Sequence, residues 1–334
     1  MLKQRKPQSP PAPADAPQSA PKQSCASSAP QPPPARVFAM LTDRGRRRQI
    51  NQDFCAARAD LGSFILCDGM GGAAAGEVAS KLASQTFLEC IAQQCCPQPS
   101  SIPPATSPPA TSLIPPEAIV SAQPRPAHPS APLAVPARPR TRLADAIRAA
   151  NQVVFRHSRT SSSLHGMGTT LVALLWEPPT PSRPSPPIWL AHVGDSRCYR
   201  LRAGVLEQLT EDHSLVQEQV RAGVINRIQA TASPMRNIIT RAIGSHPTVE
   251  ASIATHATQP GDLFLLASDG LTRELEDAEI AAILTRTLGP ARRDDASSAP
   301  ALQSALDDAC HALIDAANAH GGRDNITVLL VPCL

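Results

Sequence analysis

The chain contains short runs of apolar residues that alternate with longer segments whose apolar positions recur every three or four residues. Runs such as FILC, LVALLW and ITVLLV show no polar alternation, which is typical of strands covered on both faces. Such runs predict strands at residues 37–41, 63–67, 169–176, 188–193, 198–201, 263–267 and 326–331. Helical spacing predicts helices at residues 74–95, 143–157, 214–222, 277–287 and 302–320.

Seven or more strands with a smaller number of helices favour two sheets packed face to face, with the helices outside. Proline divides this pattern into parts. Of 36 prolines, most fall in three segments, residues 1–35, 97–140 and 178–187. Residues 1–35 have almost no large apolar groups, so we expect a disordered tail. Residues 97–140 form a Pro-rich insertion that interrupts a domain spanning 36–334, and residues 178–187 form a stiff connector between strands.

Charge and cysteine usage narrow the function classes. The formal net charge is +3, and residues 1–35 and 97–140 carry all of the excess positive charge. The rest of the chain has no net positive charge, which argues against a nucleic-acid partner. No apolar run approaches 18 residues, and the first residues lack the apolar core of a signal peptide, so we expect no membrane insertion. The nine cysteines show no CxxC spacing, which favours reduced thiols and a cytoplasmic location.

Four carboxylates interrupt apolar runs where we expect the chain to leave a sheet. Asp53 lies in NQDF, Asp68 in FILCDGMGG, Asp269 in LFLLASDGL and Asp324 in GGRDN. If these side chains met at one edge, they would repel one another unless cations held them together. Clustered carboxylates suit Mg²⁺ or Mn²⁺. This pattern predicts a metal site.

Each motif also has a simpler interpretation. An Asp-Gly pair is a common turn signal, and for Asp269 we weigh a turn equally with a functional role. GGRDN taken alone fits a turn with an Asx cap. In DGMGG the turn interpretation is weaker, because three glycines after Asp68 permit close approach of a ligand, and the segment opens a helix whose N-terminal amides favour anions.

Further candidates are charged residues and histidines near these motifs. Arg48 could grip a phosphate with two hydrogen bonds, or could be a solvated charge in a run of three arginines. Asp195 could be a turn residue paired with Arg197, or another metal ligand. His192 and His213 fit core or capping roles better than metal ligation, because no second histidine lies at metal-site spacing.

Eight motifs in this order resemble the metal-dependent Ser/Thr protein phosphatases of type 2C, in their bacterial form. The resemblance covers about residues 36–334 apart from the Pro-rich insertions. The matching stretches are TDRGRRRQINQDF, FILCDGMGG, GMGTTLV, HVGDSRCYR, LTEDHS, RNIITRAIG, GDLFLLASDGL and GGRDNITVLLV.

The resemblance implies an α+β fold, a four-layer α-β-β-α sandwich in which helices flank two antiparallel sheets. It also implies a site for two Mn²⁺ or Mg²⁺ ions at one end of the sheets. By this resemblance Asp68 bridges both metals, Asp269 and Asp324 bind the first, and the Gly69 carbonyl and Asp53 serve the second.

The same resemblance implies three further features. Arg48 corresponds to the arginine that grips the phosphate, Asp195 with Asp269 corresponds to a weaker third metal site, and a flap spans about 209–240.

Two positions depart from the family pattern. Gln52 stands where a glutamate is frequent, and Met70 stands where animal members place a proposed general acid. The proton for the leaving alcohol could therefore come from water, His192 or His213.

The function implied is hydrolysis of phosphoserine and phosphothreonine in proteins by in-line attack of a metal-bridging hydroxide. The partners implied are phosphorylated proteins and a bacterial eukaryotic-type kinase whose action the enzyme opposes. The alternatives are a catalytically weak or inactive phosphoprotein-binding regulator, a hydrolase of small phosphoesters, and a scaffold. In the scaffold, Pro-rich segments would bind partner proteins.

Overall fold

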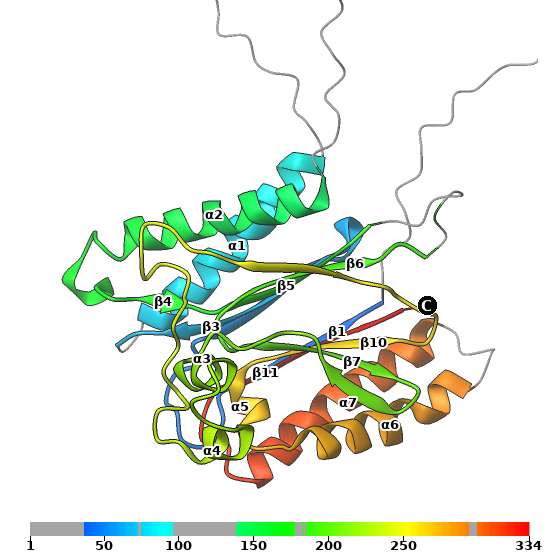
Figure 1. The fold of residues 1–334 in the computed structure, drawn as a ribbon. Helices are drawn as coiled ribbons and strands as arrows, with labels where there is room; N and C mark the ends of the chain where they lie inside the picture. The colour runs from blue at the N-terminus through cyan, green and yellow to red at the C-terminus, as the bar shows by residue number, and fades with distance from the viewer. Residues whose placement is uncertain are drawn as a thin grey trace, which may run out of the picture. The chain divides into compact units, whose positions relative to one another are not determined.

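Two antiparallel sheets form the centre of the fold (Figure 1). The computed structural model describes residues 37–72, 75–95, 138–177, 183, 185–293 and 299–333. Sheet A has the order β1 (Ala39–Asp43), β11 (Ile326–Pro332), β10 (Leu263–Ala267), β7 (Arg197–Arg202) and β8 (Val205–Gln208). Sheet B has the order β2 (Asp53–Arg58), β3 (Ser63–Met70), β5 (Leu171–Trp176), β6 (Ile188–Val193) and β9 (Ser252–His256), and β4 (Gly168–Thr169) pairs with β3.

Two pairs of long helices cover the outer faces of the sheets (Figure 1). The helices α1 (Ala75–Cys95) and α2 (Pro139–His157) pack on sheet B, and α6 (Asp277–Arg293) and α7 (Ala299–Ala319) pack on sheet A. The layers therefore follow the order helices, sheet, sheet, helices. This order confirms the predicted α+β sandwich.

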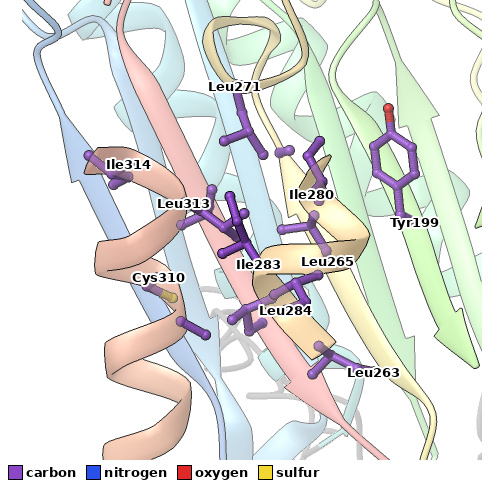
Figure 2. Close-up of a cluster of buried hydrophobic side chains, with 14 of the residues drawn as sticks. Tyr199, Leu263, Leu265, Leu271, Ile280, Ile283, Leu284, Cys310, Leu313 and Ile314 are labelled. Atoms are coloured by element: carbon purple, nitrogen blue, oxygen red, sulfur yellow. The ribbon is translucent and has the colours of Figure 1, made fainter. Parts of the chain in front are cut away.

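The uninterrupted apolar runs arise because each sheet is covered on both faces. In β10, Leu263 and Leu265 pack against α6 and α7, whereas Phe264 and Leu266 pack in the layer between the sheets. Figure 2 shows the first of these layers, where side chains of β10 meet Ile280, Leu284 and others from the helices. Successive strand residues point to opposite faces, so both sets must be apolar.

The strands missed by the apolar-run criterion are mostly edge strands. β2, β8 and β9 lie at sheet edges, and their residues are mostly half-buried or exposed. An edge strand has solvent on one side and needs no continuous apolar run. Asp53 is therefore the first residue of a strand rather than a residue at which a strand ends.

Several boundaries also differ from the prediction, and two of them concern the site and the insertion. β3 continues to Met70, so Asp68 and Gly69 lie within a strand rather than in the turn after it. α2 begins at Pro139, where proline suits the first helical turn, so the predicted insertion 97–140 is too long at its end.

The structure also contains short helical segments. These are η1 (Ala59–Leu61), η2 (Ser162–Leu164), α3 (Leu215–Arg221), α4 (Arg227–Ala232) and α5 (Asp269–Thr272). The predicted disordered tail at 1–35, most of the insertion at 97–140 and most of the connector at 178–187 lie outside the described residues. No helix within the described ranges is both long enough and apolar enough to span a bilayer.

A substitution of Phe264 tests how much the layer between the sheets contributes to stability. Phe264 is fully buried and meets Trp176 edge-to-face, with ring centroids 5.7 Å apart. We expect Phe264→Ala to lower the free energy of unfolding by about 3–5 kcal/mol, because it removes buried contacts and leaves a cavity. Urea unfolding measures this loss. The control Val205→Ala, at a side chain 68% exposed, should change stability little; equal effects would contradict the assignment of the core.

Candidate metal centre

The pairing of β2 with β3 places two of the predicted aspartates side by side. Asp53 lies opposite Asp68 in this antiparallel pair. Asp53 is buried and Asp68 is half-buried. Their carboxylates therefore share one end of sheet B, as the prediction of a converging cluster requires.

Sheet A brings the other two aspartates to the same place. Asp269 is the first residue of α5 and follows β10 after Ser268, and Asp324 lies just before β11. β10 and β11 are neighbours, so the two residues lie at one end of sheet A. The hydroxyl of Thr327 donates a hydrogen bond of 2.7 Å to Asp53 Oδ2, which joins the ends of the two sheets.

The electrostatics show that the carboxylates interact. Burial raises the pKa of Asp53 to about 6, against hydrogen bonds from Thr327 and Ser268 that lower it. Burial also raises the pKa of Asp269 to about 8. The pKa of Asp68 is raised well above its usual range, first by withdrawal from water and then by the negative charges of Asp53, Asp269, Asp195 and Asp324. All of the predicted carboxylate ligands therefore belong to one site.

Three buried oxygens of this cluster lack a hydrogen-bond partner among the described residues: Asp53 Oδ1, Asp195 Oδ1 and Asp269 Oδ1. A buried polar atom without a partner is costly, and several carboxylates at close range repel one another. Hard divalent cations bind such oxygens. The residues present therefore fit the Mn²⁺ or Mg²⁺ ions that the sequence predicts.

Two arginines hold other oxygens of the same carboxylates. Arg48 Nη2 lies 2.7 Å from Asp324 Oδ2, and the Arg273 guanidinium contacts Asp269. Over the described ranges, no three His, Cys, Asp or Glu side chains already surround a single point as a finished metal site does. The cluster thus has the composition of a metal site, with part of its negative charge balanced by guanidinium groups.

Two glycines of the predicted motifs are required by close backbone approach. A Cβ on Gly69 would lie 2.1 Å from the carbonyl oxygen of Gly76, and a Cβ on Gly270 would lie 2.0 Å from that of Asn325. Gly270 belongs to α5, so the turn at Asp269-Gly270 is a single helical turn rather than a hairpin. The role of the Gly69 carbonyl toward a metal stays a prediction.

Comparison with known proteins agrees with this geometry. A family model described as protein phosphatase 2C matches residues 42–308. The serine/threonine phosphatase stp of Listeria monocytogenes is 33% identical over 293 residues, which are 87% of this chain and 93% of that protein. The chain belongs to the protein phosphatase 2C family.

Solved structures of this family share the fold. The S. agalactiae serine/threonine phosphatase has a TM-score of 0.65 at 32% identity, over 89% of this chain and 99% of its own. The catalytic domain of the phosphatase PstP, in complex with two manganese ions, has a TM-score of 0.62 at 29% identity, over 88% and 96% of the two chains. Protein phosphatase 2C enzymes are metal-dependent hydrolases.

Asp195 of this phosphatase 2C chain follows β6 and faces the cluster. The alternative that pairs it with Arg197 is wrong, because Arg197 binds Asp212 through two nitrogens, at distances of 2.7 to 3.2 Å. Asp195 Oδ2 instead lies 3.4 Å from Arg273 Nη2. Burial raises the pKa of Asp195, and the charge of Arg273 opposes this shift.

The two histidines hold the base of the predicted flap. Their rings stack, with centroids 4.6 Å apart. His192 Nε2 lies 2.8 Å from the Glu211 carbonyl oxygen, and His213 Nδ1 accepts a hydrogen bond from the Gly194 amide. Burial lowers the pKa of His213 to about 3. Both side chains are buried, which agrees with the core interpretation, whereas the following helix α3 is capped by Ser214.

Sequence reasoning missed two residues that shape the site, Asn325 and Arg273. The Asn325 side chain accepts a hydrogen bond from the Gln52 amide and donates to the carbonyl oxygens of Arg44 and Ile50. It thereby fixes the loop that carries Arg48. Asn325 follows Asp324 in GGRDN and could have been noticed there, whereas the i,i+4 spacing of Asp269 and Arg273 is a signal only if the short helix α5 is predicted.

Stability without metal tests the carboxylate cluster. In the unfolded chain Asp53 and Asp269 titrate near 3.8, but in the folded chain their pKa values are about 6 and about 8. The folded state therefore binds more protons than the unfolded state in this range, so its stability should fall as the pH rises from about 4 to about 8. We expect a loss on the order of a few kcal/mol in EDTA, measured by urea unfolding.

Excess Mn²⁺ at about pH 8 should restore this stability, because an ion that binds only the folded state stabilises it. Asp53→Asn serves as the matched variant and should flatten part of the pH dependence. Stability in EDTA that rises over the same pH range would contradict the assigned pKa shifts.

Proposed function

We propose that this chain hydrolyses phosphoserine and phosphothreonine in proteins, with two Mn²⁺ or Mg²⁺ ions bound at the aspartate cluster. The observation that carries this proposal is the convergence of carboxylates from both sheets, of which Asp53 and Asp269 each keep a buried oxygen that has no partner among the described residues. Two similar proteins are named serine/threonine phosphatases, and a PstP structure contains two manganese ions.

The ligand roles follow the positions of the side chains. We assign Asp68 to both ions, Asp269 and Asp324 to the first, and Asp53 with the Gly69 carbonyl to the second. Asp68 suits the shared role because all of the other carboxylates act on its pKa. When bound, two such ions lower the pKa of water and stabilise both the attacking and the leaving oxygen.

The chain's own residues orient the substrate. The Arg48 side chain is 49% exposed and lies at the rim of the cluster, paired with Asp324. From there its guanidinium can turn to a phosphoryl group, which it binds with two parallel hydrogen bonds. This contact would hold the phosphorus in line for attack by water.

The proton for the leaving alcohol comes from water in this proposal. Met70 has no proton to donate, and the ring nitrogens of His192 and His213 bind Glu211, Gly194 and Ser252. A histidine whose pKa lies near 3 is neutral at physiological pH and is a poor acid. The departure at position 70 therefore leaves the water alternative as the best supported.

The physiological partners are phosphorylated proteins and the kinase that modifies them. A cytoplasmic setting fits the free thiols of Cys55, Cys67, Cys90, Cys198, Cys310 and Cys333. The flap segment, with α3 and α4, carries exposed apolar side chains beside exposed arginines, which suits contact with a protein substrate rather than a small ester.

Asparagine substitutions test the metal ligands. Asp269→Asn and Asp68→Asn should each lower phosphate release from a phosphothreonine peptide by more than about 100-fold in Mn²⁺, since the loss of an outer partner alone costs about 10–100-fold. Asp60→Asn, at an exposed ion pair with Arg58, should retain activity. A folded protein inactive with every metal would favour the phosphoprotein-binding regulator instead.

Arg48→Ala tests phosphate binding. We expect a KM for the phosphopeptide about 10-fold higher and a smaller loss in kcat, because Arg48 binds substrate and transition state alike. Arg47→Ala is the matched control at the neighbouring exposed arginine. An unchanged KM in Arg48→Ala, measured by steady-state phosphate release, would remove Arg48 from the site.

A further inference from the structure

Arg273 places a permanent positive charge inside the aspartate cluster. Its Nη2 contacts Asp269 and lies 3.4 Å from Asp195 Oδ2, and its Nη1 lies 3.8 Å from Asp324 Oδ2. The side chain is 29% exposed, less than the 49% of Arg48 at the rim. A guanidinium remains charged at every physiological pH, so this charge is always present.

The backbone fixes the position of this side chain. The Arg273 amide donates a hydrogen bond of 2.9 Å to the Asp269 carbonyl, which closes the single turn of α5. Residues four apart on a helix lie on the same face, so Arg273 stands above Asp269. Arg273 is thus held against Asp269 by local geometry, independently of the longer contact with Asp195.

In both Asp195 and Asp269, the two carboxylate oxygens lie in different surroundings. Oδ2 of each faces Arg273, and Oδ1 of each is buried without a partner among the described residues. The Oδ1 atom of Asp269 therefore remains for an ion shared with Asp324. A further cation between Asp195 and Asp269 could reach Oδ1 of Asp195, but it would lie beside the guanidinium that holds Oδ2 of both residues, and like charges at short range repel.

We propose that Arg273 limits this site to two metal ions, by taking the position beside Asp195 and Asp269 that a third cation would need. This inference rests on the proposed two-metal function. It assigns to Arg273 a positioning role: the guanidinium neutralises Asp195 and orients Asp269 without touching the substrate. The third metal predicted from the sequence should then bind only when this positive charge is removed.

The test is the number of Mn²⁺ ions bound per chain, measured by isothermal titration calorimetry on protein stripped with EDTA. We expect two ions for the wild type and three for Arg273→Gln, the third binding at least 10-fold more weakly than the others. The double variant Arg273→Gln with Asp195→Asn should return to two. Arg273→Lys keeps the charge and should bind two.

Two controls keep the outcome interpretable. Arg323→Gln removes a guanidinium paired with Glu274, with a side chain 69% exposed, and should leave the count at two. Asp195→Asn alone should also bind two Mn²⁺ ions. This variant tests the proposal even if Arg273→Gln fails to fold. Circular dichroism would show whether Arg273→Gln is folded.

Three ions in the wild type, or two in a folded Arg273→Gln, would overturn the role of Arg273 and leave the two-metal function intact. A wild type that binds no Mn²⁺ would overturn both. Loss of an ion in Asp195→Asn alone would show that Asp195 already holds a metal beside Arg273, and would also overturn the proposal.

Discussion

Mutual repulsion of carboxylates at the meeting edge of two sheets is the constraint on which this structure depends. Burial raises the pKa of Asp68, and the neighbouring charges of Asp53, Asp269, Asp195 and Asp324 raise it further. The side chains remain together because strand register positions them, as for Asp53 opposite Asp68. The apolar layers on both faces of each sheet supply the free energy that holds this register.

Polar residues offset part of the repulsion and link the sheets. Thr327 donates to Asp53 across the two sheets, Asn325 holds the loop that carries Arg48, and Arg273 forms ion pairs with Asp195 and Asp269. Within the described part of the chain, these contacts leave Oδ1 of Asp53, Asp195 and Asp269 without a partner. The result is a site that fits hard divalent cations and still folds around its own charges.

The long apolar runs of the central strands could be recognised because burial on both faces imposes one simple pattern. The run 326–331 corresponds to β11 and the run 263–267 to β10. Edge strands such as β8 and β9 escaped the same criterion because one side of each faces solvent. The aspartates were recognisable because a charge inside an apolar run is costly, and this cost points to a partner.

By itself the sequence determined the fold class, the candidate aspartates and the suitability of their oxygens for Mn²⁺ or Mg²⁺, since these follow from local pattern and ligand chemistry. Only the tertiary structure decided that Arg197 pairs with Asp212, that the two histidines stack, and that Arg273 enters the cluster. Such contacts join elements far apart in the chain or depend on what surrounds a side chain. Local spacing places Arg273 near Asp269 only once the helical turn of α5 is known, and it carries no information about contacts between distant elements.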